Sequence, residues 1–235
     1  MSITWGSAGA GVSTESSGAA LSPLCPATIT AGDILILQTA WEGTADGPNT
    51  PTGWTLLYGP QPVGAVSVVA QHWVFGKIAV GDEDGAAQAL GAPAVTTHRS
   101  ARIHRFLGRV DGGITDLVRG FSHLEEDADP TGPTVITTKA GALACALVYQ
   151  NDNNTLETFA GASDTWTERG TVGGYIFALA PGGVLDLLTA TPAADPGTVS
   201  GGAMTVFNDP WSVIGFEIRD TFDPVNLPRE YGEIP

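Results

Sequence analysis

The hydrophobic positions of the chain are most concentrated at residues 34–40, which directly follow the turn-forming triplet Ala-Gly-Asp at 31–33. This run is aliphatic and β-branched and has no helical period, so it predicts a strand that is buried on both faces. Residues 46–53 then combine two glycines, two prolines and an asparagine, a composition typical of a loop and incompatible with a helix. Trp54 ends this loop, and we expect its indole to close one end of the core.

Further apolar segments recur between turn signals along the rest of the chain. The longest are residues 66–78, which are rich in β-branched and aromatic side chains, and residues 95–107. A polar stretch at 116–133 contains an acidic run at 125–129 and predicts a surface excursion, with one short helix at 116–121. The other segments expected to form strands are 2–5, 18–21, 134–138, 143–149, 165–171, 175–180 and 211–220.

Short strands separated by turns in this way are typical of a β-sandwich or a barrel. We therefore predict an all-β fold, a single jelly-roll-like β-sandwich at residues 1–220. The last segment, 221–235, contains three prolines with Phe222, Leu227, Tyr231 and Ile234 spaced between them. Proline excludes a helix or a central strand there, so we expect an extended C-terminal arm whose four apolar side chains form an interaction surface.

The two halves of the sequence contain a faint internal similarity. Thr-Ala-Gly-Asp-Ile-Leu at 30–35 is matched by Lys-Ala-Gly-Ala-Leu-Ala at 139–144, and a Trp-Thr pair follows each segment, at Trp54 and at Trp166. Chance can produce this much similarity, and so can a repeat. If the repeat is real, two similar β-halves packed face to face would each bury an apolar face that neither could bury alone.

Composition narrows the range of partners. The chain has 235 residues and a net charge of −15, from 10 Lys and Arg against 25 Asp and Glu, so phosphate backbones and anionic membrane surfaces repel it. We expect no nucleic-acid or membrane partner, and the sequence shows neither a secretory signal nor an apolar run of membrane-spanning length. Cys25 and Cys145 lie in apolar surroundings, and we expect both to be buried free thiols.

One combination of segments resembles a known family. The Ala-Gly-Asp triplet, the aliphatic strand that ends at Trp41, the proline-rich loop and Gly-Trp-Thr-Leu-Leu at 53–57 resemble a domain found in virion genes of tailed bacteriophages, prophages and gene-transfer-agent-like particles. The resemblance continues more weakly through His72-Trp73 and residues 106–111. It implies an all-β structural module of a phage-like particle and supplies no catalytic residues.

The candidate residues for chemistry are few. The acidic clusters at 82–84 and 127–129 could offer oxygen ligands to Ca²⁺, but neither continues into an EF-hand loop, so solvated turns are the favoured interpretation. His98 and His104 have equal parity on one predicted strand, without a third metal ligand at a matching spacing. No nucleophile elbow, phosphate loop or Cys-x-x-Cys pair occurs. We therefore expect neither an enzyme nor a bound cofactor or metal.

Tryptophan leaves a second function open. Trp41, Trp166 and Trp211 could form a sugar-stacking platform, although Trp on a strand is more often core. The main expectation is a structural protein of a tailed-phage-like virion, a decoration, spike-base or tail-associated module made in the host bacterial cytoplasm. Its partners would be copies of itself and capsid or tail proteins. The alternative is a carbohydrate- or receptor-binding module whose partner is a host-surface glycan.

Overall fold

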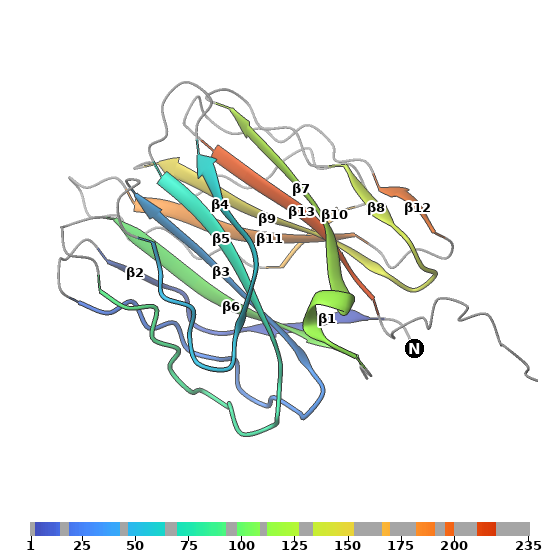
Figure 1. Ribbon diagram of the computed structural model, residues 1–235, viewed down its shortest axis with the longest axis horizontal. Helices are drawn as coiled ribbons and strands as arrows, with labels where there is room; N and C mark the ends of the chain where they lie inside the picture. Colours follow the sequence, from blue (N-terminus) through green and yellow to red (C-terminus); the bar gives the residue numbers. More distant parts are fainter. Residues whose placement is uncertain are drawn as a thin grey trace, which may run out of the picture.

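The structure is a computed structural model, and it shows two antiparallel β-sheets packed face to face (Figure 1). It describes residues 3–14, 19–42, 47–63, 70–92, 98–108, 112–126, 134–152, 166–169, 182–190, 196–199 and 211–219. The predicted all-β sandwich is confirmed. In the described part of the chain, no helix is long and apolar enough to cross a membrane.

The first half of the chain builds the first sheet. Its strand order is β1-β6-β3-β5-β4, and β2 pairs with β6 beside β1. All of its strand pairs are antiparallel. The strands are β1 (Thr4–Ala8), β2 (Val12–Thr14), β3 (Ile34–Glu42), β4 (Thr55–Val63), β5 (Ala70–Ile78) and β6 (Arg99–Leu107).

The second half of the chain builds the second sheet, in the order β7-β13-β9-β11-β10. A single helical turn, α1 (Ile114–Leu117), leads into it, and β8 and β12 form a separate two-stranded sheet. The strands are β7 (Val118–Glu126), β8 (Val135–Thr137), β9 (Leu143–Asp152), β10 (Trp166–Glu168), β11 (Gly182–Ala190), β12 (Gly197–Val199) and β13 (Trp211–Ile218).

The two sheets have the same connectivity. If β2, β8 and β12 are set aside, each half contributes five strands in the spatial order first, fifth, second, fourth and third. In each half the first strand lies at a sheet edge and carries one extra residue relative to its partner, at a register shift near Gly6 in β1 and near Gly120 in β7. The sequence similarity between the halves is therefore a structural repeat, with two similar halves facing each other.

The repeat holds at the level of single residues. Gly32 and Gly141 precede the central strands β3 and β9 with φ of 92° and 82°, values that favour glycine. Four positions after each glycine, a row of paired residues crosses four strands. These rows are His104–Ile36–Gly76–Thr55 in the first sheet and Phe216–Cys145–Thr189–Thr167 in the second. Because Trp54 and Trp166 directly precede the ends of these rows, they occupy equivalent positions.

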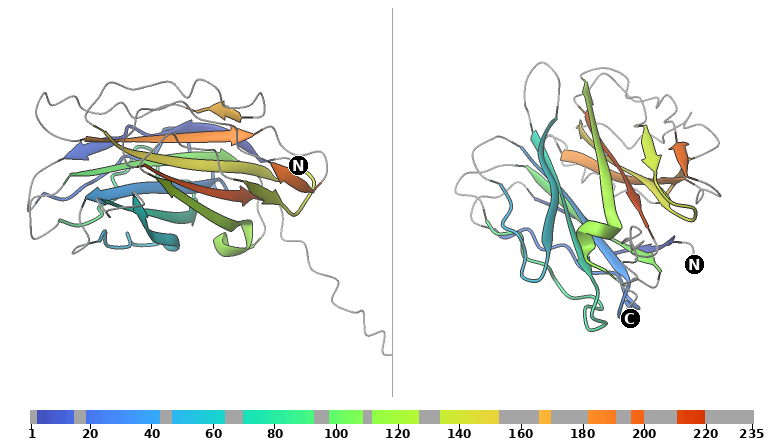
Figure 2. Two further views of the ribbon diagram at one scale, coloured as in Figure 1. Left: turned by 90° about the horizontal axis from the view of Figure 1, so that it is seen from above. Right: turned by 45° about the vertical axis from the view of Figure 1, so that its right-hand side comes forward.

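Two small outer layers cover the sandwich. The connections β3–β4 and β5–β6 each join strands that run in the same direction, so the chain must return along the sheet. Residues 19–33 and 79–92 pair with each other over the outer face of the first sheet, through backbone hydrogen bonds and the Leu24–Ala87 bridge; we call this layer the first cover. The β8–β12 pair lies at the equivalent place over the second sheet and forms the second cover (Figure 2).

Each layer boundary contains its own apolar cluster. The first cover and the outer face of the first sheet bury Trp41, Trp54 and Trp73 with aliphatic neighbours, and the second cover similarly buries Trp166 and Trp211. The predicted burial of the 34–40 strand on both faces is confirmed, since residues 34–41 are all buried. The cluster between the sheets is made of Ile3, Ile34, Ile36, Val74, Phe106, Leu117, Val118, Leu143, Cys145, Leu147, Leu187, Ile214, Phe216 and Ile218.

Several strand predictions are confirmed with altered bounds, and other expectations are wrong. Residues 118–126 form β7 instead of a surface excursion, and the helix is one turn at Ile114–Leu117 instead of 116–121. Residues 59–62, a Gly-Pro-Gln-Pro segment whose composition is typical of a turn, lie within β4; this strand is a sheet edge, where proline removes no ladder hydrogen bond, and its register shifts there. Residues 19–21 form no strand, while the predicted strand 175–180 lies outside the described residues.

Candidate functional site

A polar cluster in the described core joins the two sheets. Gln38 on β3 and His72 on β5 come from the first sheet, and Ser212 on β13 and His123 on β7 come from the second. His72 Nε2 lies 3.2 Å from Gln38 Nε2, and His72 Nδ1 lies 3.2 Å from Ser212 Oγ. Ser212 Oγ in turn lies 3.0 Å from His123 Nε2. We call these four residues the polar belt.

The hydrogen-bond partners determine which ring nitrogen of His72 carries the proton. Gln38 Nε2 donates to the backbone oxygen of Val148 at 2.8 Å and directs its second hydrogen to His72 Nε2. An amide nitrogen only donates, so His72 Nε2 accepts and Nδ1 carries the hydrogen that is donated to Ser212 Oγ. Burial, with a smaller contribution from His123, lowers the pKa of His72 to about 3, so the ring is neutral at physiological pH.

His123 joins the belt to an edge of each sheet. Its Nε2 lies 3.1 Å from the backbone oxygen of Pro62 on β4, besides the contact with Ser212 Oγ. Because a carbonyl oxygen only accepts, Nε2 carries a hydrogen and shares it between the two oxygens. Burial lowers the pKa of His123, and the hydrogen bond to Pro62 partly offsets this effect. One side chain therefore links edge strand β7 to edge strand β4.

The contact between a serine and two histidines invites comparison with a catalytic nucleophile and its base. Such a nucleophile must meet a substrate, however, and Gln38, His72 and Ser212 are all 0% exposed. The belt lies between the main inter-sheet cluster and a smaller one around Ala40 and Tyr149. Its geometry therefore suits alignment of the two sheets rather than chemistry on a substrate.

Another polar residue on the inner face, His104, is held differently. It is 0% exposed, and neither ring nitrogen has a hydrogen-bond partner in the described part of the chain. Burial, together with the nearby charge of Arg102, lowers the pKa of His104 to about 3. At the equivalent position of the second sheet stands Phe216, which packs in the apolar cluster. A neutral imidazole thus occupies a place where the repeat otherwise has a hydrocarbon ring.

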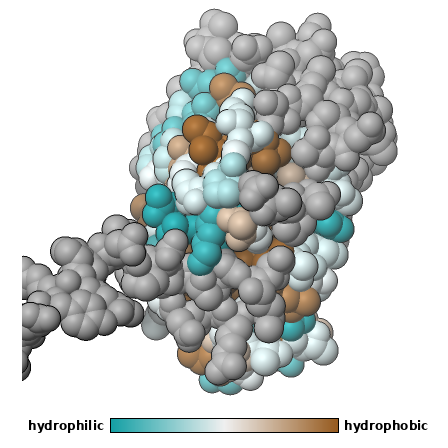
Figure 3. Space-filling view, turned by 90° about the vertical axis from the view of Figure 1, so that its right-hand side faces the viewer, coloured by the Kyte–Doolittle hydropathy of each residue, from teal (hydrophilic) through white to brown (hydrophobic). Residues whose placement is uncertain are grey.

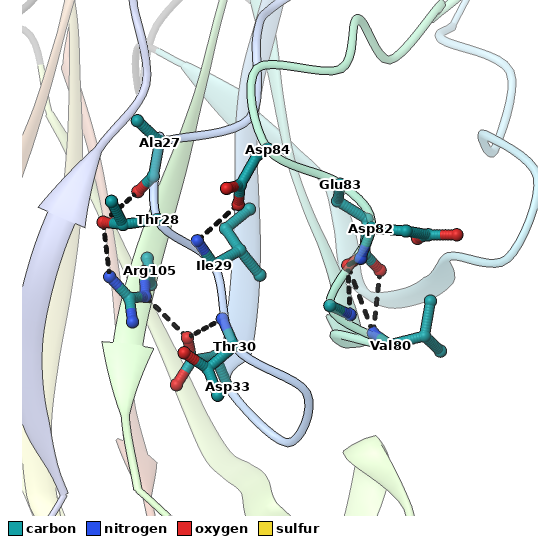
Figure 4. A network of polar contacts seen from close by, with 11 residues as sticks. Ala27, Thr28, Ile29, Thr30, Asp33, Val80, Asp82, Glu83, Asp84 and Arg105 are labelled. Atoms are coloured by element: carbon teal, nitrogen blue, oxygen red, sulfur yellow. Dashed lines mark hydrogen bonds and ion pairs between the residues drawn. The ribbon is translucent and has the colours of Figure 1, made fainter.

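A second polar network lies at one end of the first sheet, where the first cover meets β3 and β6 (Figure 4). Arg105 Nε donates to Asp33 Oδ2 at 2.6 Å, and the same oxygen accepts the backbone N–H of Thr30 at 2.8 Å. Arg105 also reaches Thr28 Oγ1 at 3.3 Å. These contacts connect the turn before the central strand β3 to β6, which is the last strand of this sheet in chain order.

The acidic cluster 82–84 belongs to the same network and is directed mainly inward. The Glu83 carboxylate accepts the backbone N–H groups of Val80 and Gly81 and pairs with Lys77 Nζ at 2.8 Å. Burial acts to raise the pKa of Glu83, but the hydrogen bonds from Lys77 and the two amides outweigh it and bring the pKa to about 2. Asp84 accepts the backbone N–H of Ile29. Two of the three carboxylates are therefore occupied by the protein itself.

The second half contains an equivalent network, in which the charged residue of the last strand is an acid instead of an arginine. Glu217 stands at the position equivalent to Arg105, is 0% exposed, and accepts the backbone N–H and the hydroxyl of Thr138 at 2.7 and 2.6 Å. Arg119 Nε lies 3.5 Å from the Glu217 carboxylate. In both halves a charged residue of the last strand holds the turn that leads into the central strand, so the mechanical role is retained while the sign of the charge is exchanged.

The structure places the tryptophans and histidines that were singled out from the sequence. Trp41, Trp166 and Trp211 are 1%, 8% and 1% exposed, so the core interpretation is confirmed and the sugar platform is not formed. His104 lies within the inter-sheet core, whereas His98 precedes β6 and pairs with Glu42 at 3.6 Å, so the two histidines do not meet. Among the described residues, no group of three or more His, Cys, Asp or Glu side chains could hold a metal ion.

The remaining candidates are the thiols, the second acidic cluster and the arm. Cys25 and Cys145 are buried and free, as predicted, and burial raises the pKa of both; that of Cys25 reaches about 11, with Glu83 adding to the shift. The cluster 127–129 lies outside the described residues. So do the four predicted interaction residues of the C-terminal arm, Phe222, Leu227, Tyr231 and Ile234.

Sequence reasoning did not predict the polar belt. Members in direct contact lie as far apart in sequence as residues 72 and 212, and each member belongs to a different strand. The available signal was a polar side chain at an inward position of an otherwise apolar strand, as Gln38 is within 34–40.

Comparisons with known proteins identify no relative. No family model, curated protein or solved structure matches the chain.

Proposed function

We propose that the chain is a structural protein of a tailed-phage-like virion, a decoration, spike-base or tail-associated module that acts through protein–protein contacts. The proposal rests on the observation that buried polar side chains of the protein bind other groups of the same chain. The belt residues, Asp33, Glu83 and Glu217 all bind the chain's own backbone or side chains and brace the repeated sheets. Such an arrangement provides rigidity, which a particle component requires.

The sequence resemblance to virion domains supports the same proposal. Among the residues that carry it, those of β3 form the central strand of the first sheet, and Trp54 packs between that sheet and the first cover. The carbohydrate-binding alternative depended on a surface tryptophan platform. All six tryptophans are described, and none is fully exposed; Trp5, only partly buried, is covered by Arg169, whose Cζ lies 5.5 Å from the ring centroid.

The C-terminal arm, 221–235, is the segment we propose for docking onto a neighbouring copy or a particle protein. Phe222, Leu227, Tyr231 and Ile234 supply apolar area, and the intervening prolines limit the conformational freedom lost on binding. Arg219, which follows β13 and lies two residues before the arm, donates its backbone N–H to Leu117 O of α1 at 2.9 Å.

The proposal is tested on particles. Phage-like particles released by an induced culture of the source bacterium are banded by density, and their proteins are identified by mass spectrometry and by immunogold labelling with an antibody against the chain. We expect the chain to band with capsid or tail proteins at a fixed copy number, and labelling to vanish in a gene-deletion strain. Particles that carry capsid and tail proteins but no copy of the chain would overturn the proposal.

A further inference from the structure

The polar belt inside the sandwich has a property that the described surface does not share. On the side that carries β8 and β12, the apolar groups of the described residues stand apart from one another among polar ones (Figure 3). In the belt, Gln38 and His72 are 0% exposed and lie between two apolar clusters. A buried group cannot turn to water when its charge or its hydrogen-bond partner changes. Its response must therefore be a rearrangement inside the fold.

A single nitrogen atom of Gln38 serves both sheets. Gln38 Nε2 donates one hydrogen to Val148 O at 2.8 Å, on the opposite sheet, and directs the other to His72 Nε2 at 3.2 Å, within its own sheet. The other end of the carboxamide, Oε1, is buried and has no hydrogen-bond partner in the described part of the chain. The orientation of the carboxamide is therefore determined by the two groups that face its nitrogen.

A proton on His72 Nε2 would reverse this requirement. A charged imidazole donates from both nitrogens, so its Nε2–H would point at an N–H of Gln38, donor against donor. Half a turn of the carboxamide brings Oε1 to this position, where it can accept from His72. The same turn directs Oε1 at Val148 O, and two acceptors repel each other. Gln38 can thus satisfy Val148 together with neutral His72, but not together with charged His72.

The surroundings of His72 oppose its charge. The titratable side chains at inward positions on the described strands around it are Glu42 on β3, Tyr58 on β4, Arg102 and His104 on β6, His123 and Glu125 on β7, and Cys145 and Tyr149 on β9. Burial is the main cause of the lowered pKa of His72, and His123 adds to it. The ring therefore remains neutral for as long as the fold around it is closed.

We propose that Gln38 and His72 form a proton-sensitive latch between the sheets, in which a proton taken up by His72 turns the Gln38 carboxamide and releases Val148. Neutral His72 leaves β3 linked to β9 through this hydrogen bond. Charged His72 replaces that link by a bond within the first sheet. Ser212 Oγ can accept from His72 Nδ1 in both states, so the change is confined to Gln38. The inference does not depend on the virion proposal.

Acid should increase the population of the released form. In the latched form the pKa of His72 is about 3, below its ordinary value of 6.5, and release of the latch relieves part of this shift. The latched form is therefore fully favoured above pH 6.5 and loses this advantage as the pH falls toward 3. Lowering the pH from 6.5 to 4.5 should raise the released population about 10-fold or more, and about 50-fold if the released ring recovers its ordinary pKa.

The experiment uses nuclear magnetic resonance on the nitrogen-15-labelled full-length chain. Two-bond proton–nitrogen spectra at neutral pH show which ring nitrogen of His72 carries the hydrogen, and we expect Nδ1. Hydrogen exchange then measures the protection of the Gln38 carboxamide, relative to its intrinsic exchange rate at each pH. This protection should fall about 10-fold or more between pH 6.5 and pH 4.5.

His72→Leu and His104→Leu are a matched pair of variants, because both rings are 0% exposed and both have a pKa lowered to about 3. The pH dependence of Gln38 protection should disappear in His72→Leu and persist in His104→Leu. An equal loss in both variants would overturn the inference, since global unfolding would then control the exchange. So would wild-type protection that does not change with pH, or a neutral His72 with its hydrogen on Nε2. The last two are measured on the wild type and need no folded variant.

Discussion

At the scale of single residues, the inner faces of the two sheets differ in polarity although their backbones repeat. Gln38, His72 and His104 stand where the second sheet has Leu147, Leu185 and Phe216. Polar groups buried without full compensation destabilise a fold, so their presence must be offset by what they specify. His72 is compensated through Gln38 and Ser212, whereas His104 has no partner among the described residues.

We expect stability to fall below neutral pH because of these two imidazoles. The folded chain lowers the pKa of both His72 and His104 from 6.5 to about 3, so they stay neutral while the unfolded chain takes up protons. Stability that is present above pH 6.5 is therefore lost as the pH falls toward 3. Between pH 8 and pH 5 the loss should be about 2 kcal/mol for each ring. Urea unfolding at a series of pH values measures it.

His104→Leu isolates one of these contributions. Removing a buried imidazole that lacks partners should raise the free energy of unfolding by about 1–3 kcal/mol at neutral pH and reduce the stability lost between pH 8 and pH 5 by about 2 kcal/mol. Phe216→His, the reverse change at the equivalent position, should destabilise the fold and steepen the slope. A His104→Leu variant with unchanged stability and an unchanged pH slope would show that this imidazole is compensated in solution.

At the scale of strands, prediction succeeded at β3, where burial is two-sided, but it missed β4 and β7 at sheet edges and also β11 inside the second sheet. The segment 34–40 is apolar on both faces because β3 has the inter-sheet core on one side and the first cover on the other, and such a run is readable from sequence. β4 and β7 are edge strands, so they tolerate Pro60, Pro62 and exposed Arg119 and resemble loops in composition. The repeated strand order could not be read from the sequence, because β-pairing between distant segments leaves no local pattern.

Trp54 and Trp166 should have similar structural roles, since they occupy equivalent positions before a residue that pairs with the fourth strand of each sheet. Trp54 is 6% exposed, and its Nε1 donates to Gln88 Oε1 at 2.9 Å. Trp54→Ala and Trp166→Ala should each lower the free energy of unfolding by about 3–5 kcal/mol, because each leaves a cavity beneath a cover. Chemical denaturation measures both, with Gln88→Ala as the control for the hydrogen bond alone. Wild-type stability in either Trp variant would contradict the core assignment.

At the scale of the whole molecule, rigidity and assembly should be separable. The described core is closed without residues 221–235, so deleting the arm should leave the melting temperature of the monomer unchanged. The same deletion should abolish incorporation into particles, because Phe222, Leu227, Tyr231 and Ile234 supply the docking surface we propose. Thermal melting and particle incorporation are measured on the same truncated chain. A lower melting temperature with intact incorporation would show that the arm folds onto its own sandwich.

The segregation of the sheets along the chain also determines the order in which they are made. All strands of the first sheet precede residue 108, so this sheet can close while the second half is still being synthesised. At about 5–20 residues per second, the ribosome needs roughly 5 to 20 s to supply the remaining strands. During that interval the inner face around Ile34, Ile36 and Phe106 has no partner sheet to cover it. Until the second sheet is made, the nascent chain therefore exposes this face to solvent.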